Sequence, residues 1–164
     1  MIIRDATMRD LPRIVEIYNA AIPGRSATAD TEPISVASRI AWVREHDPDR
    51  HPLWVAERDG RVEGWLSFQP FYGRPAYHAT AELSLYVSPA RRHEGIGRAL
   101  LARAIDTAPA LGLATLLGFI FGHNDASLSL FGRFAFHRWG LLPRVAEIDG
   151  IERDVVILGR RIGD

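Results

Sequence analysis

LSLYVSPARRHEGIGRALL, residues 83–101, is the stretch of sequence that decides the fold. Its first residues place an apolar side chain at every second position, which is typical of a strand, and Pro89 forbids continuation of that strand. From Ile96 onward, apolar residues recur every three to four positions, which is the spacing of one helical face. The stretch therefore predicts a strand, a glycine-containing turn and an amphipathic helix.

Two glycines stand where this predicted helix begins. Gly95 and Gly97 lack a Cβ, so the backbone there can approach a ligand closely. The first amides of a helix have no internal partner and, together with the helix dipole, they favour an anion. We therefore expect a pyrophosphate-binding turn made by Arg92, His93, Glu94, Gly95, Ile96, Gly97 and Arg98. The alternative is a strand-to-helix turn that carries two glycines for structural reasons alone.

Other glycine motifs do not fit this turn. Leu100 occupies the place of the third glycine of a dinucleotide fingerprint, and the Gly-Lys-Ser/Thr of a P-loop is absent. The pattern Arg92-x-x-Gly95-x-Gly97, after a strand end that reads Tyr-Val-x-Pro, resembles the coenzyme A pyrophosphate loop of the GNAT acetyltransferase superfamily. This resemblance implies acetyl-CoA as the acetyl donor.

The composition bounds the class of protein. The chain has 164 residues, 47% of them hydrophobic, and we expect a single domain over residues 1–164. The 20 basic and 20 acidic residues cancel, so we expect neither nucleic acid nor a membrane as a partner. The absence of cysteine excludes a disulfide framework and a cysteine acyl intermediate, and the histidines show no ligand spacing that would predict a metal. A charged N-terminus without a signal-peptide core favours a cytoplasmic location.

The remaining patterns predict the order strand, helix, helix, three strands, helix, strand, helix, two strands. Thr7 and Ser35 mark the starts of the first two helices, and Asp59-Gly60 and Asp149-Gly150 indicate type I′ hairpin turns. The fold class is therefore α/β (α+β), with a mixed central sheet of about seven strands and about four flanking helices. The resemblance to the GNAT fold adds a V-shaped splay between the strand before the glycine turn and the next strand.

Further motifs narrow the resemblance. They look like the phosphinothricin and methionine sulfoximine N-acetyltransferase branch, and they are Tyr18-Asn19, Thr31-Glu32-Pro33, residues 52–57, Arg74-Pro75-Ala76-Tyr77, Thr80-x-Glu82 and Tyr86-Val87. The resemblance to this branch implies a small amino-acid-like primary amine as the acceptor and a homodimer as the assembly.

Glu82 matches the catalytic glutamate of that branch, which implies that it acts as general base. Amines with pKa values of roughly 8 to 10 are mostly protonated at neutral pH and must lose a proton to attack a thioester. A carboxylate can accept that proton, directly or through water. Since the sequence offers no cysteine and no G-x-S-x-G nucleophile, we expect direct attack in a ternary complex. The alternative for Glu82 is an ordinary strand residue paired with a cation.

The resemblance also implies donor contacts outside the turn. Backbone groups near Leu85, Tyr86 and Val87 are expected to pair with the pantetheine arm, and one amide to polarise the thioester carbonyl. Asn124 matches an asparagine that hydrogen-bonds this arm, although helix capping explains it equally well. The chain departs from its relatives at Phe131, which replaces a Tyr or His proposed to protonate the departing thiolate. A thiol with a pKa near ~8.5 can still leave as its anion.

Tyr72, Arg74 and Tyr77 form the predicted acceptor site, mainly because of the family match. Arg74 would offer a planar fork to a carboxylate or phosphinate-like group, and the rings would form walls. The alternative is a surface loop in which Arg74 stays solvated. The four tryptophans, Trp42, Trp54, Trp65 and Trp139, are expected in the core without a functional role.

Two rival functions remain open from the sequence. One is acetylation of peptide or protein N-termini, with the loops 24–33 and 71–78 forming a groove instead of a pocket. The other is an acetyl-CoA-binding module that senses the donor without chemistry, which the phenylalanine at position 131 favours.

Overall fold

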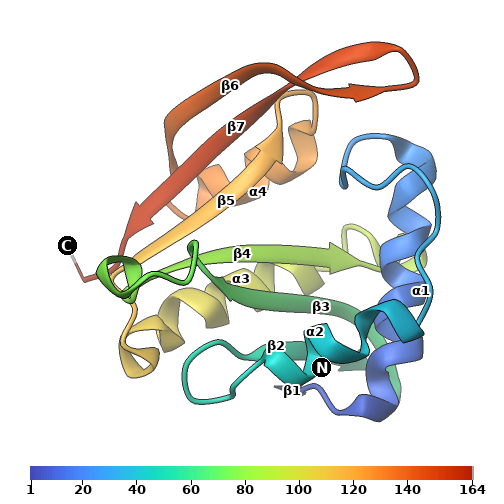
Figure 1. The fold of residues 1–164 in the computed structure, drawn as a ribbon. Coiled ribbons are helices and arrows are strands. Elements are labelled where there is room, and N and C mark those ends of the chain that lie inside the picture. The colour runs from blue at the N-terminus through green and yellow to red at the C-terminus, as the bar shows by residue number, and fades with distance from the viewer. Residues whose placement is uncertain (164) are drawn as a thin grey trace.

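The computed structural model describes residues 1–163, and its strands and α-helices follow the predicted order (Figure 1). The strands are β1 (Ile2–Asp5), β2 (Leu53–Arg58), β3 (Arg61–Pro70), β4 (Thr80–Val87), β5 (Thr115–Phe121), β6 (His137–Ile148) and β7 (Ile151–Arg161). The α-helices are α1 (Leu11–Ala21), α2 (Ile40–Glu45), α3 (Ile96–Thr107) and α4 (Asp125–Arg133). The predicted mixed sheet with four flanking helices is confirmed.

All strands form one sheet in the order β1-β2-β3-β4-β5-β7-β6. Neighbouring strands are antiparallel except β4 and β5, which are parallel because α3 crosses between them. At the turn between β2 and β3, φ is positive at both Asp59 and Gly60, at 54° and 75°. Asp149 and Gly150 show the same pattern at 54° and 77°, so both predicted type I′ turns are confirmed.

The pairing of β4 with β5 is short. It runs from Thr80 opposite Thr115 to Glu82 opposite Leu117 and then stops. Beyond that point β4 continues beside β3, and β5 continues beside β7. Figure 1 shows the two strands starting together and separating toward α1. The expected V-shaped splay is therefore confirmed. Glu82 is the last residue of β4 that pairs with β5, and it lies at the narrow end of the V.

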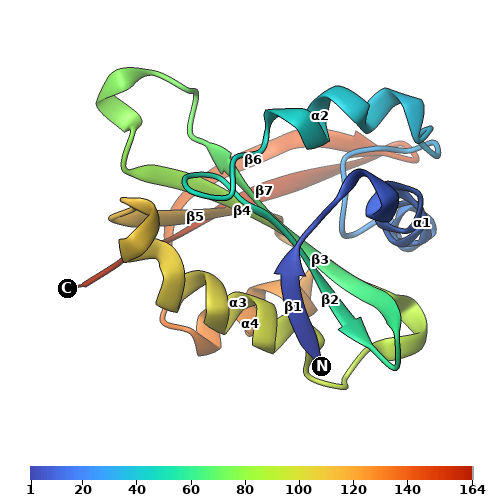
Figure 2. The same cartoon turned by 90° about the horizontal axis from the view of Figure 1, so that it is seen from below.

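Helices cover both faces of the sheet, with α1 and α2 on one side and α3 and α4 on the other (Figure 2). Two hydrophobic clusters result from the alternation of side chains along the strands. Val55 and Trp65 pack with Ile14 and Ile17 of α1. Their neighbours in sequence, such as Trp54 and Leu66, point the other way and pack among the apolar residues of α3 and α4. The V is thus flanked by two separately packed layers.

Two local expectations need correction. The Ser35 hydroxyl accepts a hydrogen bond from the Ser38 amide at 3.2 Å, but Ser35 does not cap α2, because a 3₁₀ turn, Ala37–Arg39, with Val36 as its N-cap residue lies between Ser35 and the short α2. The prediction that Trp139 is a core residue is wrong, because 49% of it is exposed. β6 is an edge strand, and the indole lies over Gly159 of β7, where a Cβ would come within 2.0 Å of the ring.

Candidate functional site

The glycine turn presents free backbone amides at the start of α3. Gly95 has a φ of 85°, in the left-handed region that strains a residue with a side chain. The amide of Ala99 donates to the Gly95 carbonyl at 3.0 Å, so the amides of Ile96, Gly97 and Arg98 precede the helical hydrogen bonds. These amides lie at the positive end of the helix dipole and suit an anionic group.

Close packing fixes α3 in this place. A Cβ on Gly64 of β3 would lie 2.8 Å from Cγ2 of Ile96, so only glycine lets the first turn of α3 approach the sheet this closely. A Cβ on Gly97 would lie 3.4 Å from Leu130 of α4 and 3.6 Å from Val87. The beginning of α3 therefore lies between the end of β4 and α4.

Charged side chains around the turn divide into paired and exposed groups. Glu94 forms ion pairs with Arg58 and Arg91, each at 3.4 Å, so its negative charge is balanced by two cations. Arg92, His93 and Arg98 are exposed. Within residues 1–163, no carboxylate lies within ion-pair distance of Arg92 or Arg98. These two cations are thus exposed without a carboxylate partner among the described residues, and their binding of a phosphate stays a prediction.

The backbone of β4 offers an unpaired edge inside the V. The amide of Ser88 donates to the Glu63 carbonyl at 2.8 Å, which fixes the direction of the backbone groups along the strand. In an antiparallel ladder this direction alternates, so Leu85 and Val87 turn their amides and carbonyls away from β3 and into the V. Since pairing with β5 ends at Glu82, both residues can hydrogen-bond an extended ligand there.

The side chain of Glu82 lies at the narrow end of the V, opposite Gln69 of β3. It is half-buried, and no side chain or backbone group of residues 1–163 hydrogen-bonds its carboxylate. Burial raises the pKa of the Glu82 carboxyl above its usual value. The alternative of a strand residue paired with a cation is therefore not observed, and a carboxylate with a raised pKa is a stronger base.

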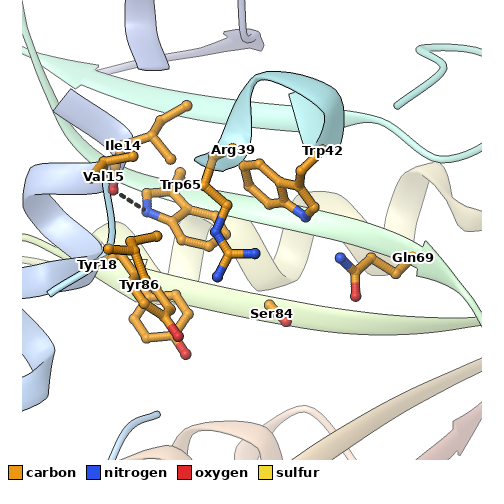
Figure 3. Close-up of a pocket in the computed structure, with 10 residues that line it drawn as sticks. Ile14, Val15, Tyr18, Arg39, Trp42, Trp65, Gln69, Ser84 and Tyr86 are labelled. Atoms are coloured by element: carbon orange, nitrogen blue, oxygen red, sulfur yellow. Dashed lines mark hydrogen bonds between the residues drawn. The ribbon is translucent and has the colours of Figure 1, made fainter. Parts of the chain in front are cut away.

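An aromatic cavity of about 200 Å³ lies on the α1 and α2 side of β3 and β4 (Figure 3). Four aromatic rings line it, contributed by Tyr18, Trp42, Trp65 and Tyr86. The rings of Trp65 and Tyr86 stack at 4.8 Å, and those of Trp42 and Trp65 meet edge to face at 5.5 Å. Such contacts give the walls a fixed shape.

The polar lining of this cavity leads toward Glu82. Ser84 and Tyr86 line it, and Glu82 follows on the same side of β4 because side chains alternate along a strand. Gln69 lines the cavity too and is the cross-strand neighbour of Glu82. A charged residue, Arg39, also lines this cavity, and its guanidinium points into the cavity between the rings (Figure 3).

The segment after α1 crosses the open end of the V. On the β4 side of the V, the Tyr86 hydroxyl donates to the Ala27 carbonyl at 3.0 Å. On the β5 side, His123 Nε2 lies 2.8 Å from the Arg25 carbonyl, and Arg25 pairs with Asp149 of the β6–β7 turn at 3.1 Å. The sequence predicts a polar loop here. That this loop connects the β4 and β5 sides of the V follows only from its contacts with distant segments.

The predicted acceptor residues lie elsewhere. Arg74 and Tyr77 line a second cavity of about 300 Å³ together with residues such as His51, and none of the three predicted residues lines the aromatic cavity. Tyr72 is 78% exposed and Tyr77 is 43% exposed, with their rings packed around Phe71. The loop that carries them leaves β3 after Pro70 and enters β4 at Thr80, so it begins and ends beside Gln69 and Glu82.

Asn124 and Phe131 have structural roles in α4. The Asn124 side-chain oxygen accepts a hydrogen bond from the Ser127 amide at 3.2 Å, so the capping interpretation is observed. Phe131 is 4% exposed, meets Phe136 edge to face at 5.0 Å and lies over Gly118 of β5. The ring of Phe131 thus fills the space between α4 and the sheet.

Sequence reasoning missed the residues that form the aromatic cavity. It placed Trp42 and Trp65 in the core without a role, and it did not single out Arg39. Trp65 is 3% exposed but still forms part of a cavity wall, whereas Trp42 is half-buried above it. The one available signal is that Arg39 and Trp42 are three residues apart, a spacing that brings side chains together on a helical turn.

Neither a metal cluster nor a membrane-spanning helix occurs in the described part of the chain. Within residues 1–163, no three or more His, Asp or Glu side chains are arranged to hold a metal ion. No helix among these residues is long and apolar enough to span a membrane.

Comparison with known sequences gives a family match. Residues 11–136 match the family described as "Acetyltransferase (GNAT) family". YwnH of Bacillus subtilis strain 168, for which phosphinothricin acetyltransferase activity has been proposed, is 49% identical over 163 residues, with 99% of each chain covered. The L-methionine sulfoximine/L-methionine sulfone acetyltransferase of Pseudomonas aeruginosa is 34% identical over 160 residues, covering 95% of this chain and 91% of the relative.

Solved structures agree with the fold. The crystal structure of a GNAT superfamily phosphinothricin acetyltransferase from Sinorhizobium meliloti in complex with acetyl-CoA has a TM-score of 0.92 and 31% identity. The match covers 99% of this chain and 88% of that one. The sheet with its V is therefore shared with a protein that binds acetyl-CoA.

Proposed function

This chain belongs to the acetyltransferase (GNAT) family, and we propose that it transfers the acetyl group of acetyl-CoA to a small amino-acid-like amine. The acceptor is of the phosphinothricin or methionine sulfoximine type, as the names of the relatives suggest. The observation that carries the proposal is the position of Glu82, because this unpaired carboxylate lies where the narrow end of the V meets the aromatic cavity.

The donor side fits acetyl-CoA. The free amides at the start of α3, with Arg92 and Arg98 exposed beside them, suit a pyrophosphate. The unpaired backbone edge at Leu85 and Val87 suits the amides of a pantetheine arm, which pair with it as a strand would. In this proposal His93, Glu94, Gly95, Ile96 and Gly97 shape the turn, Tyr86 holds the edge in place, and Asn124 contributes its free side-chain nitrogen.

The reaction is direct transfer. Acetyl-CoA supplies an activated thioester. Glu82 accepts a proton from the acceptor amine, whose nitrogen forms a bond to the acetyl carbon while the carbon–sulfur bond breaks and coenzyme A leaves as its thiolate. An amide of the β4 edge donates to the carbonyl oxygen as negative charge develops there. Because Phe131 cannot donate a proton, the thiolate takes its proton from water.

The acceptor occupies the aromatic cavity, with its amine toward Glu82. Because the loop with Tyr72, Arg74 and Tyr77 begins and ends next to Gln69 and Glu82, we place it at the outer entrance of the same site. Arg74 is exposed there and can meet an anionic group of the acceptor as it enters.

We propose a homodimer as the assembly and the cytoplasm, where acetyl-CoA is supplied, as the location. The edge strand β6 and its partner β7 carry exposed apolar side chains, among them Trp139, Leu142, Val145 and Ile151. An exposed edge strand with such residues favours association with a second copy. Light scattering after gel filtration measures the mass directly.

A thiol-release assay with acetyl-CoA tests the proposed function. The acceptors are phosphinothricin, methionine sulfoximine, methionine sulfone, common amino acids, polyamines and short peptides. We expect rates above background for the first three. Faster release with peptides would instead support N-terminal acetylation, and binding of acetyl-CoA without release for any amine would support a sensor of the donor.

A further inference from the structure

Arg39 differs from four other arginines that are partly buried in this protein. Arg4, Arg13, Arg58 and Arg91 each donate hydrogen bonds to carboxylates or carbonyls. The side chain of Arg39 is 33% exposed, and within residues 1–163 no group accepts a hydrogen bond from its guanidinium. Its nearest charged partner is Asp30, at 3.7 Å, which is beyond hydrogen-bond distance. Five N–H donors are therefore held near the cavity without an acceptor.

Aromatic rings hold this guanidinium in position. Its central carbon lies 5.6 Å from the centre of the Tyr18 ring and 5.9 Å from that of Trp42. Both distances are within the range of cation–π attraction. Asp30 pairs with the guanidinium at 3.7 Å without a hydrogen bond, and the same Asp30 oxygen accepts a hydrogen bond from the Tyr18 hydroxyl. The N–H groups at the edge of the guanidinium remain directed into the cavity (Figure 3).

The chemistry of this arrangement indicates an oxyanion ligand. A guanidinium donates two parallel hydrogen bonds to a carboxylate, and such charge-assisted bonds are about twice as strong as neutral ones. In a cavity walled by rings, a neutral amide or hydroxyl would leave most of the five donors unpaired, which is costly in a partly buried site. A carboxylate satisfies both the charge and the donors.

Resting on the proposed function, we infer that Arg39 is a specificity-determining residue that binds the carboxylate of a free amino acid while the α-amine lies toward Glu82. The site then selects acceptors that carry a free acid beside the amine. Peptide and protein N-termini lack that acid, and so do simple amines. Arg39 thereby distinguishes the small-molecule function from the N-terminal acetylation that the sequence leaves open.

Paired acceptors test this inference in the full-length protein. Methionine sulfone and its decarboxylated analogue, 3-(methylsulfonyl)propylamine, differ only in the carboxylate. In Arg39→Gln we expect kcat/KM for methionine sulfone to fall roughly 10- to 100-fold relative to wild type, since hydrogen bonds to charged groups contribute that much. For the decarboxylated amine, kcat/KM of Arg39→Gln should stay within about twofold of the wild-type value, and the KM for acetyl-CoA should not change. Arg39→Lys keeps the cation but not the fork, so its loss is intermediate.

Arg44→Gln is the matched control, because Arg44 is exposed and lies on α2, directly after the 3₁₀ turn that ends at Arg39. Arg44→Gln should leave kcat/KM unchanged for both methionine sulfone and the decarboxylated amine. Equal losses for both acceptors in Arg39→Gln, or no loss for either, would overturn the inference. Trp42 and Trp65 line the cavity, so their fluorescence reports acceptor binding without turnover. If the wild type releases no thiol with any amine, the proposed function fails. The role of Arg39 as a carboxylate ligand then fails separately if methionine sulfone does not quench this fluorescence, or quenches it equally in Arg39→Gln.

Discussion

The two sides of the V are built differently. In the proposed function, the donor side consists of residues 83–98, one continuous stretch that offers mostly backbone amides, at Leu85, Val87 and the start of α3. The proposed acceptor side is a cavity assembled from side chains of α1, the following segment, α2, β3 and β4. A pyrophosphate and a pantetheine arm do not vary, so backbone geometry is enough to bind them. An acceptor differs among relatives, and side chains from separate segments can change one at a time.

Glu82 lies where the two sides meet, and its removal should separate chemistry from binding. In Glu82→Gln the amine loses its proton acceptor, so we expect kcat to fall ~10²- to 10⁴-fold, which is typical of general-base catalysis. The dissociation constant for acetyl-CoA, measured by calorimetry, should not change. In the wild type, the rate should decline as pH falls through the raised pKa of Glu82, because a protonated carboxyl cannot accept a proton.

Glu45→Gln supplies the control, since Glu45 is an exposed carboxylate at the end of α2. It should retain full activity. If Glu82→Gln keeps more than about a tenth of the wild-type kcat, the assignment of Glu82 as general base is wrong, because the loss of kcat is then smaller than the usual contribution of a general base.

Glu63 connects the two sides and tests whether they are independent. It is 3% exposed, pairs with Arg13 of α1 at 3.1 Å, and lies 3.9 Å from Arg91 of the donor turn. Glu63→Ala leaves the Arg13 charge without its buried partner, so we expect a loss of about 3 kcal/mol or more in the free energy of unfolding, measured in urea. Acetyl-CoA affinity should weaken as well, because Arg91 loses one of its anchors.

Glu16→Ala is a matched comparison, because Glu16 also pairs with Arg13 at 3.1 Å but is 62% exposed at its side chain. An exposed pair contributes about 0 to 1 kcal/mol. Similar losses for the two variants would contradict the view that the buried Glu63 carboxylate holds α1 and the donor turn together.

Gly95 tests the donor side alone. Its φ of 85° costs about 1–2 kcal/mol for a residue with a Cβ, although no atom within 4 Å blocks that Cβ. In Gly95→Ala we expect stability to fall by that amount and the acetyl-CoA dissociation constant to rise up to about tenfold as the turn relaxes. Acceptor binding, followed by tryptophan fluorescence, should be unaffected.

Gly132→Ala has the opposite expectation. Gly132 is exposed within α4, its φ is not in the left-handed region, and a Cβ added to it would meet no atom within 4 Å. Alanine there should stabilise the protein by roughly 0.5–1 kcal/mol. If both glycine variants behave alike, the left-handed conformation at Gly95 is not what shapes the turn.

The same contrast explains what the sequence could predict. The glycine turn is local, so the spacing of Gly95 and Gly97 after a strand was enough to predict the strand, the turn and the start of the helix, and the hairpins followed from Asp-Gly pairs. That the turn binds a pyrophosphate stays a prediction. The order of elements was predictable for the same reason. The cavity was not, because Tyr18, Arg39 and Trp65 meet only through the tertiary fold, and a tryptophan in a cavity wall has the same sequence pattern as one in the core.

His46 tests the acceptor side with the smallest expected effect. It ends α2, with Nδ1 2.7 Å from the Trp42 carbonyl and Nε2 2.7 Å from the Ser67 hydroxyl, and so anchors the helix that carries Trp42. Burial lowers the pKa of His46 below 6.5, while the bond to the Trp42 carbonyl partly opposes this. Between the lowered pKa and 6.5 the unfolded chain binds more protons than the folded one, so this group's contribution is present above pH 6.5 and is lost as pH falls below it.

In His46→Gln we therefore expect a shallower fall in unfolding free energy between about pH 7 and pH 5 than in wild type, with a difference near 1 kcal/mol or less. Part of the slope should remain, because burial lowers the pKa of His51 too. Urea titrations at each pH measure this slope. Because His46 contacts α2 and not the donor turn, acidification should loosen acceptor binding, read from Trp42 and Trp65 fluorescence, before it weakens acetyl-CoA binding. Parallel losses of both ligands with pH would show that the two sides, although built differently, respond as one unit.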